Sequence, residues 1–222
     1  MMNPDEGDLV LPSHLPVMIL PEATLFPHAL MPLYLFEPKY RAMLDWVLAR
    51  DRMFCIAMAK DQDMEDEESV SFHITAGAGV VRACRTNEDG TSHLFLQGIG
   101  RVKLSGFSDE HPFVFAAIDA ITTHCSTDGD FILTRLRKAL GLLQEEGVNI
   151  PPNLETAIGQ LENPEAVVDL LCGAIGFPGE VRQELLSESF LEKRANTLFQ
   201  HLGLATGQED AFRELMIGDG EV

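Results

Sequence analysis

Positive charge is scarce in this 222-residue sequence. Only 16 Lys and Arg stand against 35 Asp and Glu, which gives a formal net charge of −19. The excess of acids runs through both halves of the chain and is not confined to one tail. A field of this sign repels nucleic acids and anionic membranes and keeps a protein soluble. We therefore expect no nucleic-acid partner and no membrane partner.

The sequence also lacks a long apolar run. The stretch from Ala23 to Phe36 has no charged residue, but Pro27, His28 and Pro32 interrupt it. A membrane-spanning helix needs about 20 apolar residues. Residues 1–6 contain two acids and no base, unlike the positive start of a signal peptide. These features predict a cytoplasmic protein.

Residues that would carry familiar chemistry are few and scattered. The chain has no phosphate-binding GxxxxGK[ST] loop, no HExxH and no GxSxG, and no two of its seven histidines are spaced i, i+3 or i, i+4. We therefore expect no catalytic site of these types, no metal and no cofactor. The cysteines form no CxxC pair, and in the cytosol they are expected to be free, buried and inert. They are Cys55, Cys84, Cys125 and Cys172.

Residues 9–122 are rich in strand patterns, and we interpret them as a β-barrel domain. Pro32 predicts an edge strand or a bulge, because proline cannot donate to a sheet ladder. Asp89-Gly90 predicts a hairpin turn. The glycine pairs at Gly77 and Gly98 are interpreted as flexible or close-packed strand positions, and the acidic run 61–68 as a solvated loop. The expected strands are 15–20, 30–36, 53–59, 73–85, 94–97, 101–104 and 113–121.

One helix is expected among these strands. Pro38 suits its first position, and Glu37 is expected to cap it, where a negative charge favours the helix dipole. Tyr40, Leu44 and Val47 recur on one face, which should be buried. Trp46 lies about 200° round the helix from Leu44 and should be at least partly exposed, or lie against the helical half.

The second half has helical periodicity. We expect a helical bundle over residues 126–204 and a tail over 205–222 with a short helix at 209–216. Asn153 and Asn163 are expected to cap two of the helices, Pro178 to open a third, and Ser187 or Ser189 to cap a fourth. Strands followed by helices predict an α+β fold.

Three motifs in the first half are specific enough to indicate a family. They are the run Leu15 to Pro21, the segment Thr24-Leu25-Phe26-Pro27, and the run Met31 to Arg41. Together they resemble the N-terminal domain of the Lon family of ATP-dependent proteases. The positions around Gly77, Asp89-Gly90 and Gly98 to Arg101 are similar as well, and the likeness covers about residues 13–203. The sequence departs from the family at His28, where the family usually has Gly, and at Ile19, where it often has Phe.

The resemblance implies a PUA-like β pseudo-barrel with one inserted helix, followed by a C-terminal helical bundle. It also implies a stand-alone, non-catalytic polypeptide-binding module, because the family's ATPase and Ser-Lys peptidase motifs are absent from this sequence. Its partners would be unfolded or exposed polypeptide segments, with a protease or chaperone as a further partner in protein quality control. An RNA-binding PUA-like module and an unrecognised hydrolase that uses a cysteine or histidine remain as alternatives.

The motif residues are the candidates for a peptide-binding site. Two interpretations stay open for the polar ones: they line a peptide groove, or they form a structural network in which Glu37 caps the helix and pairs with an arginine. The second is favoured, because a carboxylate at a helix N-terminus already accounts for Glu37. Pro27 and His28 lie in a loop and are better site candidates than core residues. The full set is Pro27, His28, Leu33, Tyr34, Phe36, Glu37, Tyr40, Arg41 and Arg101.

Overall fold

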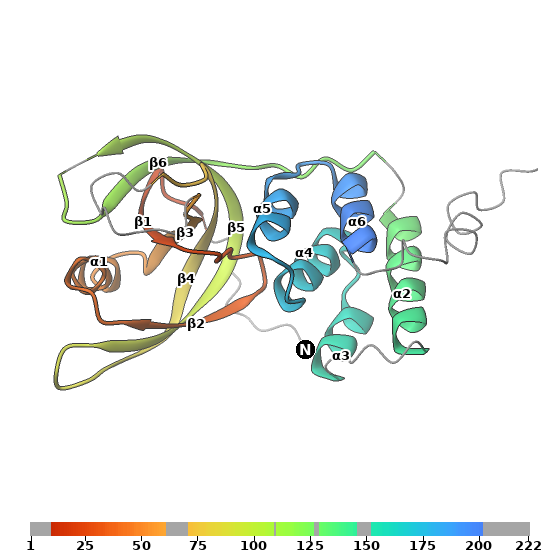
Figure 1. Ribbon diagram of the computed structural model, residues 1–222, viewed down its shortest axis with the longest axis horizontal. Coiled ribbons are helices and arrows are strands. Elements are labelled where there is room, and N and C mark those ends of the chain that lie inside the picture. The colour runs from red at the N-terminus through yellow and green to blue at the C-terminus, as the bar shows by residue number, and fades with distance from the viewer. Residues whose placement is uncertain (1–9, 61–70, 109, 127–128, 146–151, 202–222) are drawn as a thin grey trace, which may run out of the picture. The chain divides into compact units, whose positions relative to one another are not determined.

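The computed structural model describes residues 10–60, 71–108, 110–126, 129–145 and 152–201, and Figure 1 shows their helices and strands. The chain forms two compact units. Unit 1 contains residues up to 122 together with residues 178–187, and unit 2 contains residues 123–177 together with those from 188 onward. The fold is α+β, as predicted. The expected 126–204 domain differs from unit 2, because residues 178–187 return to unit 1.

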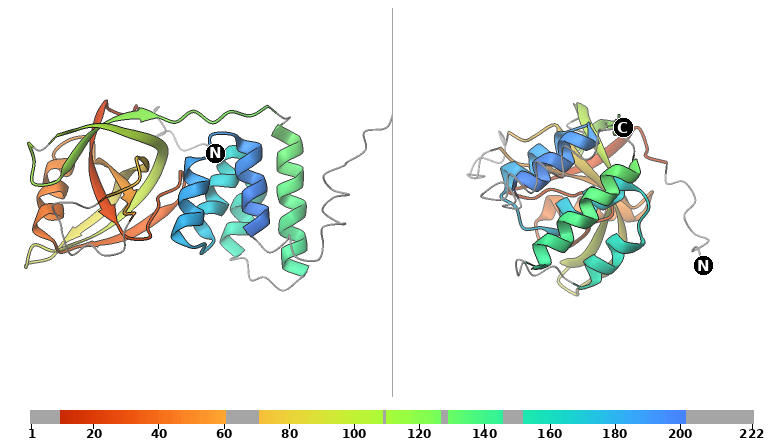
Figure 2. Two further views of the ribbon diagram at one scale, coloured as in Figure 1. Left: turned by 45° about the horizontal axis from the view of Figure 1, so that its top comes forward. Right: turned by 90° about the vertical axis from the view of Figure 1, so that its right-hand side faces the viewer.

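A ring of five strands forms the centre of unit 1. The strand order is β2-β5-β4-β3-β1-β6, and a further pairing of β5 with β6 closes the ring. Strands β1 and β3 are parallel, and the other pairs are antiparallel. Strand β2 lies outside the ring, paired with β5 (Figures 1 and 2). The strands are β1 (His14–Leu20), β2 (Leu30–Leu35), β3 (Met53–Met58), β4 (Thr75–Thr86), β5 (Ser92–Ser108) and β6 (Val114–Ala120).

Strand β5 corrects one prediction from the sequence. Two strands were expected, at 94–97 and 101–104, but β5 runs unbroken from Ser92 to Ser108. Gly98 lies inside it, because the backbone of another segment crosses there: a Cβ added at Gly98 would lie 2.0 Å from the carbonyl oxygen of Phe26. A Cβ added at Gly77 would lie 1.9 Å from the carbonyl oxygen of Leu25. Both glycines are therefore close-packed strand positions, as one of the two interpretations proposed.

We predict that Gly98→Ala destabilises unit 1 by about 1–3 kcal/mol or more, the cost of overpacking a close-packed site. The measurement is a urea melt followed by the fluorescence of Trp46, the single tryptophan of the chain, which lies in unit 1. Gly100→Ala is the matched control on the same strand, since a Cβ added there would meet only the Leu11 side chain, at an ordinary contact distance of 3.5 Å. This change should therefore alter stability by less than about 1 kcal/mol. Equal effects of the two substitutions would refute the close-approach explanation.

Helix α1 (Pro38–Leu48) covers one side of unit 1 and buries the expected face. Tyr40, Met43, Leu44 and Val47 are buried, and they pack with the inner side chains of β2 and β5 in a core separate from the one inside the ring. The Tyr40 hydroxyl donates to the Ile19 carbonyl at 2.9 Å. Helix α1 is thus held to β1 by a buried polar contact as well as by apolar packing.

Of the predictions made for single residues of this region, the one for Trp46 is confirmed and the one for Glu37 is wrong. Trp46 is half-buried, as expected, with the Arg50 guanidinium 4.1 Å from its ring centroid. The expected capping by Glu37 is wrong, because its side chain makes no capping hydrogen bond although it occupies the N-cap position. Its carboxylate turns instead to the Lys39 ammonium at 3.4 Å. A neighbouring cation has replaced the helix N–H groups as its partner.

The described part of unit 2 contains four helices: α2 (Gly129–Glu145), α3 (Pro152–Gln160), α4 (Pro164–Ala174) and α6 (Leu191–Phe199). Asn163 caps α4 as predicted, accepting from the backbone N–H of Glu165 at 2.9 Å. Helix α3 begins at Pro152, so Asn153 lies in its first turn and not before it. The expected helix at 209–216, the rest of the 205–222 tail and the acidic run 61–68 lie outside the described residues.

The start of α6 corrects another prediction. Its N-cap residue is Phe190, without a side-chain cap, and neither Ser187 nor Ser189 has that role. The backbone explains the position, because the segment before α6 pairs with the start of unit 2. His124 N–H donates to the Ser189 carbonyl at 2.8 Å, and Leu191 N–H donates to the His124 carbonyl at 2.9 Å.

A buried ion pair joins two helices of unit 2. Arg194 of α6 is fully buried, and its Nη1 lies 3.1 Å from Oδ1 of Asp169 on α4. Its Nη2 lies 3.6 Å from Oε1 of Glu165. Because a buried charge without a partner is costly, these two helices depend on each other.

We predict that Asp169→Asn destabilises unit 2 by about 3–5 kcal/mol, the range for breaking a buried ion pair by removing one partner. Far-UV circular dichroism in a urea melt measures the loss. The control is Glu37→Gln, which breaks the more exposed Glu37–Lys39 pair and should cost no more than about 1 kcal/mol. A loss below 1 kcal/mol for Asp169→Asn would contradict the prediction.

Helix α5 (Gly179–Ser187) belongs to unit 1 although it lies late in the sequence, and Pro178 directly precedes it as expected. Three side chains hold it through backbone carbonyls. Arg101 Nη1 donates to the Leu186 carbonyl at 3.0 Å, and Gln183 Nε2 donates to the Thr75 carbonyl at 3.0 Å. Arg182 donates to the Glu22 carbonyl. The chain therefore passes between the two units three times.

Candidate functional site

Strands β2, β5 and β4 expose one continuous sheet face outside the ring. Directly opposite residues of antiparallel strands share a face. The register pairs Leu30 with Gln97, Pro32 with Phe95, and Tyr34 with His93, and it pairs Phe95 and His93 with residues of β4. We call this surface the flap face. Its members are Leu30, Pro32 and Tyr34 of β2, His93, Phe95 and Gln97 of β5, and Arg82, Ala83 and Arg85 of β4.

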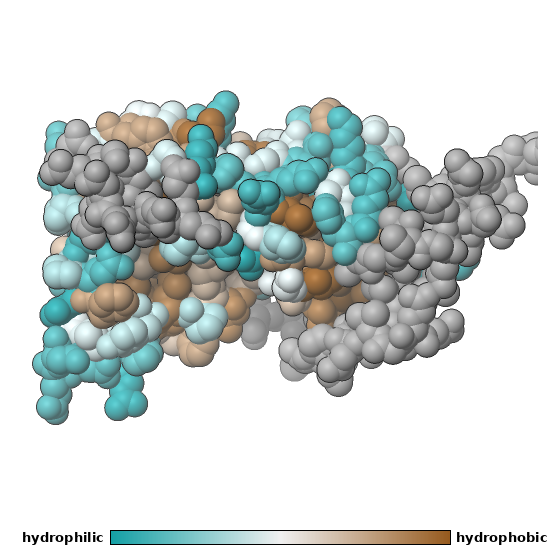
Figure 3. Space-filling model, viewed as in Figure 1, coloured by the Kyte–Doolittle hydropathy of each residue, from teal (hydrophilic) through white to brown (hydrophobic). Residues whose placement is uncertain are grey.

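Several large apolar side chains on and beside the flap face are exposed. Leu30 is 57% exposed, Tyr34 49% and Phe95 46%, and Phe36 just beyond β2 is 59% exposed. Figure 3 shows hydrophobic surface along the part of unit 1 where β2 runs, beside the hydrophilic tip of the β4–β5 hairpin. Contiguous exposed apolar surface marks an interaction site more often than scattered single residues do.

Ring contacts give the flap face a fixed shape. The Tyr34 and His93 rings stack with centroids 4.6 Å apart, and Phe36 lies against Tyr34 at 5.9 Å. Beside them is a surface hollow of about 470 Å³, lined by residues of all three strands that include Pro32, Tyr34 and Phe95. A hollow of this size accepts one or two side chains of a ligand, not a whole folded partner.

Strand β2 is an edge strand of the sheet, as Pro32 predicted. Gly98 N–H donates to the Ala29 carbonyl at 2.9 Å, so the backbone groups of Ala29 point toward β5. Alternation along an antiparallel strand then points those of Leu30, Pro32 and Tyr34 toward the open edge. Pro32 has no N–H, so it interrupts the row of donors at that edge. Side chains on the flap face are therefore the stronger candidate for binding than the strand edge.

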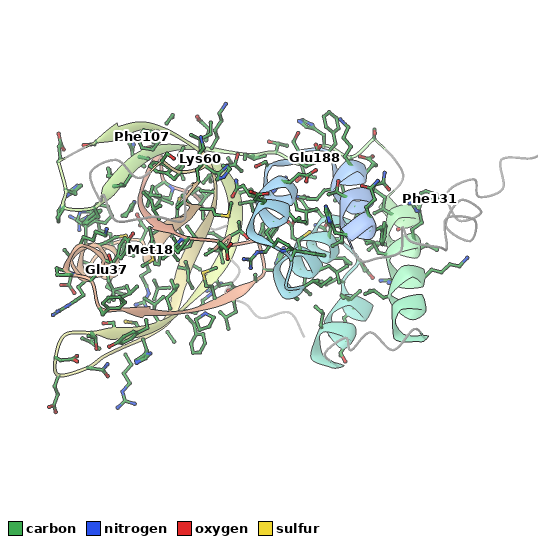
Figure 4. All side chains as sticks on the ribbon, viewed as in Figure 1. Met18, Glu37, Lys60, Phe107, Phe131 and Glu188 are labelled. Atoms are coloured by element: carbon green, nitrogen blue, oxygen red, sulfur yellow. The ribbon has the colours of Figure 1, made fainter. Side chains whose placement is uncertain are left out.

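The candidate residues from β2 and its end meet at this surface. Tyr34 belongs to the flap face, Phe36 extends it, and Leu33 lines the hollow. Glu37 lies at the start of α1 beside a second hollow of about 400 Å³, which Pro38, Lys39 and Pro112 also line (Figure 4). These four of the nine predicted residues are thus exposed or line a hollow.

Pro27 and His28 precede β2 and have different roles. Pro27 is buried, whereas His28 is exposed with a backbone φ of 65°. That left-handed conformation favours glycine, which accounts for the usual residue of the resembled family at this position. His28 N–H donates to the Gly98 carbonyl at 2.9 Å, so the strained residue fixes the chain as it enters β2.

Tyr40, Arg41 and Arg101 serve the structure. Tyr40 bonds to Ile19 in the core, and Arg101 is 3% exposed and holds α5. Arg41 packs against the β4–β5 turn, where a Cβ added at Gly90 would lie 1.9 Å from its Nη2. Gly90 has φ +79°, as a hairpin turn requires.

Tyr34 is the one member of the flap face in the candidate set from the sequence. The other eight were not predicted, among them His93, Phe95, Arg82 and Arg85. The signal that could have found Phe95 and His93 is the alternation across Ser92 to Gln97, read together with the Asp89-Gly90 turn. That turn sets the register of β4 against β5, and in this register Arg85 lies opposite His93. Arg85 could therefore have been predicted once His93 was placed. The placement of β2 beside β5 has no local signal.

Among the described residues, no group of three His, Cys, Asp or Glu side chains could hold a metal ion. Burial, with a further contribution from Lys60, lowers the pKa of His73. No helix in the described ranges is long and apolar enough to cross a membrane.

The cysteines differ from one another, which corrects the expectation that all four are buried. Cys55 and Cys172 are buried, Cys84 is half-buried beside the hollow of the flap face, and Cys125 is exposed. Burial raises the pKa of the Cys55 thiol to about 12. None of the four forms a disulfide, as predicted.

We predict that Ellman's reagent at pH 8 modifies Cys125 first, Cys84 more slowly, and the two buried thiols only after denaturation. The thiolate is the reactive form, and a raised pKa keeps Cys55 protonated up to about pH 12. Mass spectrometry of the labelled peptides identifies each site. Rapid labelling of Cys55 in the folded protein would contradict the burial that the structure shows.

Sequence comparison places this chain in a known family. The model for the ATP-dependent protease La (LON) substrate-binding domain matches residues 14–203. The chain belongs to this family. Among curated proteins it is 22% identical over 184 residues to a Lon protease of Trichlorobacter lovleyi and 25% identical over 198 residues to one of Anaeromyxobacter dehalogenans. It covers 22% and 23% of their lengths, respectively, and they cover 82% and 86% of this chain.

Solved structures agree in fold. The N-terminal domain of Mycobacterium avium complex Lon protease matches with a TM-score of 0.68 at 15% identity, over 86% of this chain and 98% of that one. A Lon N-terminal domain protein from Xanthomonas campestris matches with a TM-score of 0.59 at 16% identity, over 85% and 98%. The α+β arrangement is thus one that Lon N-terminal domains share.

Proposed function

We propose that this chain binds extended, exposed polypeptide segments through the flap face and does not itself catalyse a reaction. The observation that carries the proposal is the exposed apolar surface of Tyr34, Phe36 and Phe95 beside a side-chain-sized hollow. Family membership supports the choice of polypeptide as the ligand, since the family is described as a substrate-binding domain.

The shape of the surface suits an unfolded ligand. A flat sheet face with one hollow takes a segment in extended conformation, whose alternate side chains point toward it. Pro32 removes a donor from the edge of β2, which leaves the aromatic side chains as the main source of affinity. Such contacts depend on side-chain type and tolerate many sequences.

We further propose that unit 1 is a PUA-like pseudo-barrel and unit 2 a helical bundle, and that the protein acts as an adaptor. It would present captured segments to a separate protease or chaperone. The closed strand ring of unit 1 and the match to Lon N-terminal domains support this assignment. An RNA-binding role is disfavoured by the net charge of −19, and the sequence has no GxSxG or HExxH motif in favour of a hydrolase role.

We predict that the double variant Tyr34→Ser, Phe95→Ser weakens binding of a reduced, carboxymethylated lactalbumin chain at least about 10-fold, as expected for removal of two exposed aromatic anchors. Fluorescence anisotropy of the labelled chain measures the affinity. The matched control is Phe107→Ser, because Phe107 is 49% exposed and lies near the other end of β5 (Figure 4).

Trp46 fluorescence and a urea melt check that each variant is folded. Equal losses in the double variant and the Phe107 control would show nonspecific adhesion and would overturn the flap face as the site. If the parent chain itself does not bind the labelled lactalbumin chain, and neither variant does, the proposed function is overturned.

A further inference from the structure

We infer that the flap face selects segments in which carboxylates flank the apolar residues, and that Arg82 and Arg85 determine this preference. This inference rests on the proposed function. It assigns a ligand charge to the surface and gives specificity roles to two residues that the motif analysis did not include.

The charges of the flap face run opposite to those of the whole chain. Acids outnumber bases 35 to 16 in the sequence, yet the nine residues of the flap face include two arginines and no Asp or Glu. Arg82 and Arg85 are both exposed. A ligand without carboxylates would gain nothing from the two arginines and would find more favourable electrostatic contacts on the acidic remainder of the surface.

The arginines stand on either side of an apolar centre. Arg85 lies opposite His93, and the His93 ring stacks on Tyr34. These three residues form one row across β4, β5 and β2. Arg82 donates from Nε to Oε1 of Gln97, which lies opposite Leu30 in another row. Between these two rows lies a third, made of Ala83, Phe95 and Pro32.

This arrangement defines the spacing of the ligand charges. Arg82 and Arg85 are three residues apart on β4, at most about 10 Å at the rise of a strand. The register shift between Val81 and Ala83 lets both side chains lie on the flap face despite this odd spacing. An extended segment with one to three apolar residues between acidic ones would bring a carboxylate near each guanidinium. The bond to Gln97 uses only Nε of Arg82, and an arginine has four further N–H donors for a carboxylate.

Single-stranded RNA is the competing ligand, because arginines beside aromatic rings also bind phosphates and stack on bases. The observations favour the peptide. RNA carries a charge on every nucleotide and meets the repulsion of a chain with net charge −19, whereas a peptide can restrict its carboxylates to the two arginines.

The test uses three labelled seven-residue peptides with the same Phe-Val-Phe centre, flanked on each side by two Asp, two Ser or two Lys. We expect the Asp peptide to bind about 3- to 10-fold more tightly than the Ser peptide in anisotropy titrations at low salt, the sum of two exposed ion pairs. The Lys peptide should bind most weakly, and 1 M NaCl should abolish the differences.

Variants separate local contacts from the overall field. Arg85→Glu should reverse the order and favour the Lys peptide. Lys103→Glu changes the net charge by the same amount on an exposed β5 residue outside the flap face and should leave the order unchanged. If the two variants shift the order equally, the whole-chain field sets the preference and the assignment to Arg85 is overturned.

The outcomes distinguish the inference from the proposed function. Equal affinities for all three peptides, with loss in the Tyr34→Ser, Phe95→Ser variant, would overturn the inference and support polypeptide binding. No binding of any peptide would overturn both. Tighter binding of a 20-nucleotide oligouridylate than of the Asp peptide, lost in Arg85→Glu, would assign the surface to RNA.

Discussion

The antiparallel register of β2 on β5 is the constraint on which the exposed surface of unit 1 depends. With a side-chain period of two, it sends Leu33 and Leu35 into the core with α1 and leaves Leu30, Pro32 and Tyr34 outside. A slip by one residue would exchange the two sets. The buried set explains why this does not happen, because the core under α1 would lose its apolar side chains to solvent.

The register itself begins at a point of backbone strain. His28 adopts a left-handed conformation and bonds to Gly98, while Gly98 has no side chain because the Phe26 backbone crosses it. The loop before β2 and the middle of β5 thus fit each other through backbone atoms. Side-chain variation on the flap face is free of this constraint, so the surface can change its specificity without loss of the fold.

The sequence predicted those features that depend on residues close together in the chain. Pro32 marked an edge strand, Asp89-Gly90 marked a hairpin, Asn163 marked a helix cap, and the spacing of Tyr40, Leu44 and Val47 marked a buried helix face. The errors arose where distant contacts decide. Glycines that normally end a strand lie inside β5 because another segment needs the space, and Glu37 pairs with Lys39 instead of the helix end.

The candidate site also contains residues that a local motif identified and residues that only distant contacts bring into place. Tyr34 and Phe36 came from a family motif, but their partners Phe95, His93 and Arg85 lie some 50 to 60 positions later in the sequence and meet them through strand pairing. Arg101 illustrates the opposite case. A motif position suggested a binding residue, whereas its guanidinium is buried against helix α5 from the far end of the chain. Residue type alone does not distinguish these roles; burial does.

The overall charge opposes self-association through the exposed apolar face. Two flap faces that met would bury aromatic surface, which favours association, but two chains of net charge −19 repel each other at the distances where encounter begins. The repulsion is long-ranged and weakened by salt, whereas apolar contact is short-ranged and is not weakened by it. At low ionic strength the surface is therefore protected from its own copies. It stays available to a ligand whose few charges can be matched locally by Arg82 and Arg85.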